Sequence, residues 1–104
     1  MVSATVERNI TLDERAIAEF CRRHHIRKLS LFGSVLTDRF RPDSDVDVLV
    51  EFEPGKTPGF EFFRMADDLE AMLGRRVDLT TPNGLSKYIR DRVLSQAQTV
   101  YAAN

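Results

Sequence analysis

The sequence predicts one mixed α/β (α+β) domain, with a single sheet and helices packed mainly on one face of it. Stretches with helical periodicity alternate along the chain with stretches in which apolar and polar residues alternate. Glycines and prolines stand at the boundaries between these stretches. No repeat, low-complexity tract or linker interrupts the 104 residues, so residues 1–104 are interpreted as a single small domain.

The chain is expected to begin with a helix and a strand. Residues 11–26 offer Thr11 as an N-cap and Glu14 as its capping-box partner, and apolar residues follow at helical spacing. Residues 27–32 alternate between apolar and polar side chains, and Gly33 ends the run. This pattern predicts a helix followed by a strand with two unlike faces.

A short helix and the strongest strand pattern of the chain come next. The helix is predicted from Ser34 to Phe40, because Pro42 stops it and forces the residue before it out of helical geometry. The strand is DVDVLVEF, residues 45–52, in which valines recur at every second position. After it, PGKTPG at residues 54–59 is the clearest loop, since four of its six residues are glycine or proline.

Two further helices and two strands complete the predicted order. Residues 60–74 indicate an amphipathic helix closed by Gly74, and residues 75–81 alternate as a strand. Residues 83–98 predict a last helix with an inward apolar face, and residues 99–102 a short terminal strand. Residues from these helices that are expected to face the core include Phe60, Phe62, Phe63, Leu85, Ile89 and Val93.

Charge and cysteine content limit the class of partner. Fifteen Lys and Arg against 16 Asp and Glu leave a formal charge of −1, which offers no general attraction to nucleic acid or to an anionic membrane. The single cysteine, Cys21, has no partner for an internal disulfide, and no signal segment or long apolar run is present. We therefore expect a soluble, cytoplasmic protein that does not bind nucleic acid or membranes directly.

Three aspartates are expected to share the open face of the sheet. Side chains alternate along a strand, so Asp45 and Asp47 point to one side while the valines point to the core. The same rule puts Asp78 of the next strand on that open side. Converging carboxylates repel one another unless cations lie between them, and a hard divalent ion such as Mg²⁺ prefers oxygen ligands. Alternatively, Asp78 is a solvated edge residue or a partner of Arg75 or Arg76.

The Gly33-Ser34 pair has the chemistry of a phosphate-binding turn. Glycine lets the backbone approach a ligand closely, and the N-terminus of the following helix offers N–H groups to an anion. The Ser34 hydroxyl would donate to a phosphate oxygen. The ten residues between this pair and Asp45 amount to a short helix and a turn, which brings a phosphate site beside a metal site. Further basic candidates for a triphosphate lie on the last helix: Lys87, Arg90 and Arg92.

The pattern of Gly33-Ser34, ten residues, then Asp45-x-Asp47 resembles the signature of the polymerase-beta-like nucleotidyltransferase superfamily. The segment LFGSVLTDRFRPDSDVDVLVEF is similar to its minimal members, the MNT domains, and the likeness spans essentially the whole chain. The resemblance implies a nucleotidyltransferase-like fold, ATP as substrate and two Mg²⁺ ions. It also implies that Asp45 and Asp47 ligate both metals, while Asp78 ligates one and helps deprotonate the acceptor. The implied nucleotide-binding residues are Gly33, Ser34 and Ser44.

Many minimal members of this family resemble antitoxins. The resemblance thus implies a protein adenylyltransferase that transfers AMP from ATP to a tyrosine hydroxyl of a HEPN-type RNase toxin and associates with that toxin as a hetero-oligomer. So short a chain also lacks the domain with which larger relatives bind an acceptor, which favours an acceptor on a partner protein. Two alternatives stay open, namely an antitoxin that occludes its toxin without catalysis, and a nucleotidyltransferase that acts on a small-molecule hydroxyl.

The segment after the serine departs from the family pattern. Members often carry an arginine-rich stretch there, whereas Val35, Leu36 and Thr37 stand in this chain. The phosphate contact that those arginines make therefore falls to Arg39, to Arg41 or to no side chain.

Overall fold

A mixed sheet lies at the centre of the computed structural model, which describes residues 9–103. The strand order in this part of the chain is β3-β2-β1-β4, with β1 antiparallel to both of its neighbours and β2 parallel to β3. Two short 3-10 helices, η1 and η2, lie in the connections. The elements in chain order are α2 (Glu14–Arg23), β1 (Ile26–Phe32), η1 (Gly33–Leu36), β2 (Val46–Phe52), α3 (Glu61–Leu73), β3 (Val77–Thr80), η2 (Pro82–Gly84), α4 (Lys87–Gln96) and β4 (Gln98–Ala102).

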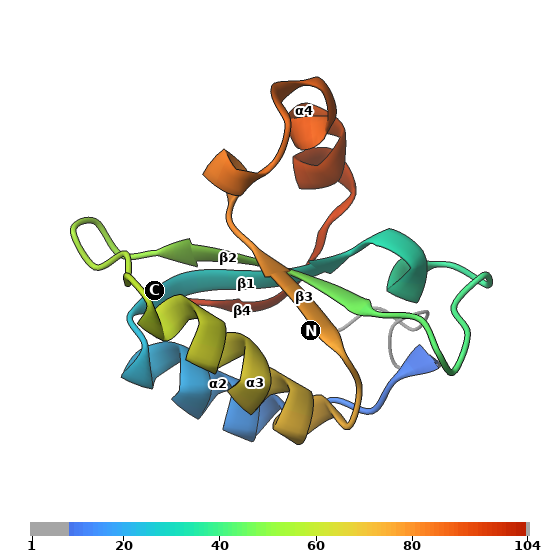
Figure 1. Ribbon diagram of the computed structural model, residues 1–104, viewed down its shortest axis with the longest axis horizontal. Coiled ribbons are helices and arrows are strands. Elements are labelled where there is room, and N and C mark those ends of the chain that lie inside the picture. Colours follow the sequence, from blue (N-terminus) through green and yellow to red (C-terminus); the bar gives the residue numbers. More distant parts are fainter. Residues whose placement is uncertain (1–8, 104) are drawn as a thin grey trace.

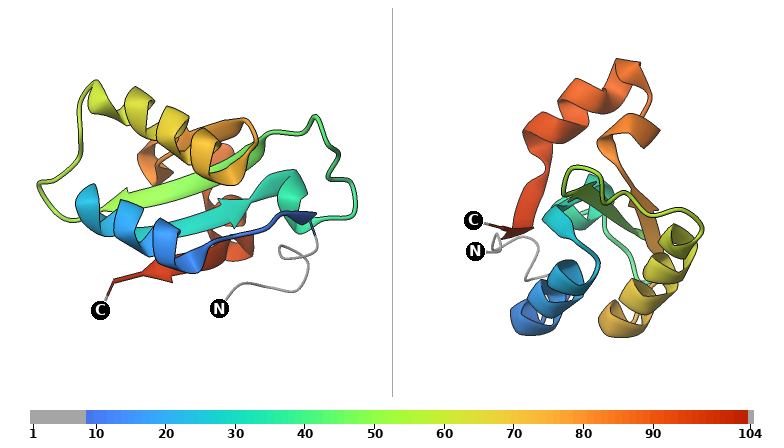
Figure 2. Two further views of the ribbon diagram at one scale, coloured as in Figure 1. Left: turned by 90° about the horizontal axis from the view of Figure 1, so that it is seen from below. Right: turned by 90° about the vertical axis from the view of Figure 1, so that its left-hand side faces the viewer.

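Two helices cover one face of the sheet, and a third stands over the other face. α2 and α3 lie side by side below the sheet in Figure 1, and both views in Figure 2 agree with this placement. α4 rises on the opposite side, between η2 and β4. The predicted fold class, a single mixed sheet with helices mainly on one face, is confirmed.

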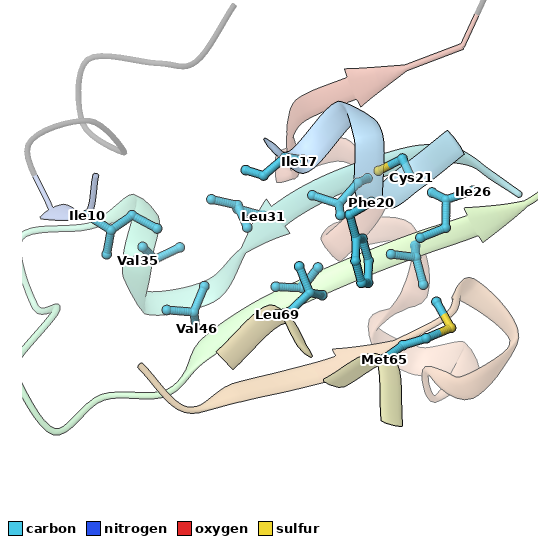
Figure 3. Close-up of a cluster of buried hydrophobic side chains, with 13 residues drawn as sticks. Ile10, Ile17, Phe20, Cys21, Ile26, Leu31, Val35, Val46, Met65 and Leu69 are labelled. Carbon is cyan, nitrogen blue, oxygen red and sulfur yellow. The ribbon is translucent and has the colours of Figure 1, made fainter. Parts of the chain in front are cut away.

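The central strand β2 supplies one wall of the hydrophobic core. Its Val46, Val48 and Val50 are fully buried, in one cluster with Phe20 of α2 and Leu69 of α3 (Figure 3). A fully buried side chain of this kind stabilises the fold by roughly 1.5–3 kcal/mol. The packing therefore holds β2 firmly and turns the alternate side chains of the strand to the other face, as predicted.

The first helix begins later than predicted. Asp13, not Thr11, is the N-cap, because its side chain accepts a hydrogen bond from the Ala16 N–H at 3.1 Å. The helix ends at Arg23, and His25 just beyond it takes a left-handed backbone conformation with a φ of 59°. The predicted helix is thus correct in position but too long at both ends.

The helix predicted from Ser34 to Phe40 is wrong. Only Gly33–Leu36 is helical, as the 3-10 turn η1. Thr37 ends the turn, since its N–H and its hydroxyl both donate to the Ser34 carbonyl, at 2.9 and 2.8 Å, and its own backbone is extended. A β-branched residue that bonds to its neighbouring backbone competes with the next helical turn. The helix N-terminus predicted as a phosphate site is therefore only a tight turn.

The last helix is shorter than predicted and does not enter the core. The predicted helix 83–98 divides into η2 and α4, with Ser86 as the N-cap of α4. No residue of α4 is buried and Ile89 is 40% exposed, so the predicted inward face is wrong. Charged residues occupy much of this helix and leave it too few apolar side chains for a buried stripe. Phe60 and Phe63, also predicted for the core, are 92% and 72% exposed.

The other predicted elements are confirmed with small shifts of their ends. α3 stops where Gly74 adopts a left-handed conformation with a φ of 69°. β3 and β4 lie within or close to the strands predicted at residues 75–81 and 99–102. Within residues 9–103, no helix is long and apolar enough to cross a bilayer.

Replacing His25 with glycine is expected to stabilise the protein. A Cβ in the left-handed region costs about 1–2 kcal/mol, and His25 is exposed, so little packing is lost with its side chain. Because glycine also gains freedom in the unfolded chain, we expect a net rise of about 0.5–1 kcal/mol in the free energy of unfolding, measured by urea denaturation. His25→Ala keeps the Cβ and is the control; equal stability of the two variants would contradict the explanation.

Candidate active site

Asp47 and Asp78 lie side by side on neighbouring strands. Asp47 of β2 pairs in register with Asp78 of the parallel strand β3. Their neighbours Val46 and Val77 contribute to the core, so both aspartates point to the face opposite α2 and α3. Asp45 immediately precedes β2 and stands at the same end of the sheet. The structure thus brings together the three acids that strand alternation predicts to meet.

The pKa of Asp47 is raised by burial and by repulsion from the other acids. Burial of its side chain raises this pKa above the usual value for an aspartate, and the negative charges of Asp78 and Asp45 raise it further. The half-buried Asp47 carboxylate therefore interacts electrostatically with two other carboxylates. Such an arrangement favours a bound cation when all three groups are ionised.

An arginine partly neutralises Asp45. The Asp45 Oδ1 lies 3.1 Å from the Arg76 Nε, and both side chains are at least half exposed. Arg76 therefore forms its ion pair with Asp45, and not with Asp78, the partner that the sequence offered as an alternative. Among the side chains of residues 9–103, no three His, Cys, Asp or Glu are gathered tightly enough to hold a metal ion. An exposed ion pair is worth about 0–1 kcal/mol, so a divalent cation can replace Arg76 at little cost.

Gly33 is required both by its backbone conformation and by the carboxylate beside it. Its φ is 77°, in the left-handed region that favours glycine. A Cβ added to Gly33 would overlap the Oδ2 of Asp47. Phe32 pairs with Asp47 across β1 and β2, so the turn that follows β1 lies directly against the acid. The Gly-Ser turn and the acids therefore form one site.

The two predicted nucleotide-binding serines lie at opposite ends of the loop between β1 and β2. Ser34 is half-buried in η1, directly after Gly33. The Ser44 hydroxyl accepts a hydrogen bond from the Arg41 N–H at 3.1 Å and so shapes the turn that leads into β2. Ser44 thus has a structural role here, and its role in nucleotide binding stays a prediction.

Two residues that sequence patterns did not reveal hold this loop in place. The Asn9 side-chain amide donates to the carbonyls of Val35 and Thr37, at 2.6 and 2.9 Å. The Arg75 guanidinium donates to the carbonyls of Arg41 and Pro42, at 3.2 and 3.1 Å. These contacts join residues at least 26 positions apart, and no local pattern in the sequence signals them.

The turn opens onto two hollows that α4 closes from the other side. One, of about 230 Å³, is lined by Phe32, Gly33, Ile89, Arg92, Val93 and Gln96. The other, of about 600 Å³, is lined by Gly33, Leu36, Thr37, Ser95, Gln96 and Gln98. Gly33 lies at both, so a groove runs between the Gly-Ser turn and α4.

The chemistry of this site suits a divalent metal together with a polyphosphate. Asp45, Asp47 and Asp78 offer carboxylate oxygens, which Mg²⁺ prefers, and their mutual repulsion is relieved by a cation. Gly33 gives a close approach to the backbone, and a groove large enough for a ligand begins there. The donor chemistry of these residues therefore suits Mg²⁺ and a nucleotide, and the three acids have to draw closer together than they stand here to share one ion.

Replacing Asp78 with asparagine is expected to lower the pKa of Asp47. The substitution keeps the shape of the side chain but removes one of the two charges that disfavour ionised Asp47. Carbon-13 NMR titration of the Asp47 carboxyl, without added metal, measures the shift. Asp67→Asn on the opposite face, in α3, is the matched control and should leave the Asp47 pKa unchanged. An unchanged pKa in Asp78→Asn would show that the two carboxylates do not interact.

Gly33→Ala is expected to destabilise the fold more than Gly55→Ala. Both glycines have a φ of 77°, so both substitutions carry the same conformational cost of about 1–2 kcal/mol. Only at Gly33 does the new methyl group also collide with Asp47, because nothing lies within 4 Å of a Cβ at Gly55. We expect an additional loss of about 1 kcal/mol or more in urea denaturation, of the size seen for overpacking. Equal losses would mean that Asp47 moves aside freely.

Comparison with known sequences identifies the family. The family model described as the nucleotidyltransferase domain matches residues 14–100. Protein adenylyltransferase MntA of Thermococcus cleftensis is 35% identical to this chain over 92 residues, which cover 88% of each protein. The Gly-Ser turn and all three acids lie within the range that the family model matches.

Solved structures agree in fold. A toxin-antitoxin structure with AMP-PNP superposes with a TM-score of 0.72 at 22% identity, over 89% of this chain and 76% of that chain. The tri-AMPylated Shewanella oneidensis HEPN toxin in complex with its MNT antitoxin gives a TM-score of 0.64 at 21% identity, over 94% and 73%. Together with the sequence match over most of its length, this likeness shows that the chain belongs to the nucleotidyltransferase-domain family.

Proposed function

We propose that this protein is a Mg²⁺-dependent protein adenylyltransferase that transfers AMP from ATP to a tyrosine hydroxyl of a HEPN-type RNase toxin, and so acts as its antitoxin. The observation that carries the proposal is the in-register pair of Asp47 and Asp78, with Gly33 against Asp47. The relative MntA, named as a protein adenylyltransferase, supports the reaction. Similar folds in complexes that contain AMP-PNP or an AMPylated HEPN toxin support the substrate and the partner.

The proposal extends to the setting of the reaction. Residues 1–104 act as one minimal domain and associate with the toxin as a hetero-oligomer. The cytoplasm is the proposed compartment, since both ATP and an RNase toxin act there. Because the toxin carries the acceptor, the nucleotide is the small molecule that this chain itself must bind.

The three acids are the proposed metal ligands. Asp45 and Asp47 would hold two Mg²⁺ ions, and Asp78 would hold one of the two. Bound there, Mg²⁺ supplies a lowered pKa for the acceptor hydroxyl and charge neutralisation for the departing pyrophosphate. Asp45 exchanges its exposed ion pair with Arg76 for this role, which costs little.

Asp78 also receives the acceptor proton in this proposal. The acceptor oxygen bonds to the α-phosphorus of ATP, the bond from that phosphorus to the bridging oxygen breaks, and pyrophosphate leaves. Asp78 is exposed on β3, at the edge of the sheet, so it is accessible to the hydroxyl of another protein. Gly33 and Ser34, with Ser44 across the loop, hold the triphosphate while this occurs.

The double variant Asp45→Asn/Asp47→Asn is expected to lose AMP transfer while it keeps its fold. The amides cannot replace the negative oxygens that bind Mg²⁺, and a metal contribution of several kcal/mol corresponds to about a thousandfold or more in rate. Intact mass of the toxin after incubation with ATP and Mg²⁺ measures the transfer, and circular dichroism verifies the fold. Asp43→Asn, which changes a neighbouring loop acid, is the matched control and should remain active. Transfer at the wild-type rate by the double variant would remove the mechanism.

Dependence on ATP separates catalysis from occlusion. If the protein acts by AMP transfer, a small amount of it silences an excess of toxin, and only when ATP and Mg²⁺ are present. Protection of RNA that is stoichiometric and indifferent to ATP would instead indicate an antitoxin that only covers its toxin. An acceptor other than the toxin, such as a small-molecule hydroxyl, would appear as a product without any change in toxin mass.

A further inference from the structure

The phosphate-binding turn contains no cation of its own. Residues 33–37 read Gly-Ser-Val-Leu-Thr, and Val35 is fully buried in the core beneath the turn. Neither a buried valine nor its neighbours can neutralise a polyphosphate. Besides the proposed Mg²⁺ ions, a cationic side chain near the turn would therefore stabilise a triphosphate held here.

A single charged side chain lines the groove next to this turn. Among the residues that line the two hollows at Gly33, only Arg92 is charged. Arg92 belongs to α4 and shares the smaller hollow with Gly33, on the opposite wall. Apolar side chains from both walls, Phe32, Ile89 and Val93, complete this hollow.

The guanidinium of Arg92 is also available. Within residues 9–103 it forms no hydrogen bond, ion pair or ring contact, whereas the backbone carbonyl of Arg92 accepts a hydrogen bond from the Ser95 hydroxyl. The other two basic residues of α4 are occupied. Arg90 donates to the carbonyls of Pro82 and Leu85 at 2.8 and 3.0 Å, and the Lys87 ammonium lies 5.4 Å from the centre of the Tyr88 ring.

We infer that Arg92 binds a phosphate group of the nucleotide from across the groove, supplying the positive charge that the Gly-Ser turn lacks. A guanidinium can donate two parallel hydrogen bonds to one phosphate, which makes arginine the suited residue for this contact. The inference rests on the proposed function for its substrate and adds a specific polyphosphate-binding residue to it. It also adds a residue of α4 to Arg39 and Arg41, the arginines that the sequence offers for the phosphate contact.

The test compares Arg92→Gln with Lys87→Gln, a variant with the same loss of charge on the same helix. The KM for ATP in AMP transfer to the toxin is measured at fixed Mg²⁺, and the dissociation constants of MgATP and of adenosine are measured by calorimetry with the full chain. We expect Arg92→Gln to raise both the KM and the MgATP dissociation constant by about tenfold or more, as for loss of a charged hydrogen bond. The affinity for adenosine, which has no phosphate, should not change.

The remaining variants decide between recognition and a structural effect. Lys87→Gln should stay within about twofold of the wild type, and Arg92→Lys should recover part of the lost affinity, since it restores charge without the planar fork. An Arg92→Gln protein that binds MgATP as the wild type does would overturn the inference. Equal losses for MgATP and adenosine would overturn it as well, because they would show a damaged groove. If the wild type binds MgATP but transfers no AMP, the proposed function fails while the binding comparison still tests Arg92.

Discussion

The site depends on the register between the parallel strands β2 and β3. A shift of one residue would turn Asp78 to the opposite face, because side chains alternate along a strand. Two carboxylates 4 Å apart repel by about 1 kcal/mol in water and about 4 kcal/mol at an effective dielectric constant of 20. Each of the buried valines Val46, Val48 and Val50 contributes roughly 1.5–3 kcal/mol, so the core exceeds this repulsion and fixes the acids in place. The fold thereby maintains a cluster of negative charges whose mutual repulsion a bound cation would reduce.

The loop between β1 and β2 is positioned by contacts at both of its ends. Asn9 binds carbonyls of η1, and Arg75 binds carbonyls just before Ser44. Gly33 lies so close to Asp47 that the turn and the acid cannot move independently. The proposed phosphate site and the proposed metal site are therefore coupled, because a change that displaces the turn also displaces Asp47. This closeness and the left-handed backbone together are the physical reason for a glycine directly after β1.

Local patterns predicted the parts of the structure that local forces determine. Period-two alternation placed Asp47 and Asp78 on one face, and a left-handed glycine ended α3 where expected. The errors occur where distant contacts or side-chain bonds decide. The helix after Ser34 was lost to the hydrogen bonds of Thr37, which a propensity argument does not count. The contact of Asn9 joins segments far apart in the chain, and which of three basic residues faces the groove depends on how α4 sits over the sheet.

The groove has two walls, the Gly-Ser turn with β2 on one side and α4 on the other. They differ in rigidity, and so they suit different roles. Asp47 belongs to β2, which is anchored in the core, and Gly33 directly follows β1 and lies against Asp47, so this wall can hold reacting groups to within a fraction of an ångström. α4 has no buried residue, and segments with few buried contacts open most easily. The side chain of Arg90 is hydrogen-bonded to the segment that precedes α4, so these bonds hold the N-terminal end of the helix. In the proposed function, Arg92 on such a helix follows a flexible phosphate chain and contributes affinity, while the strands set the geometry of the chemical step.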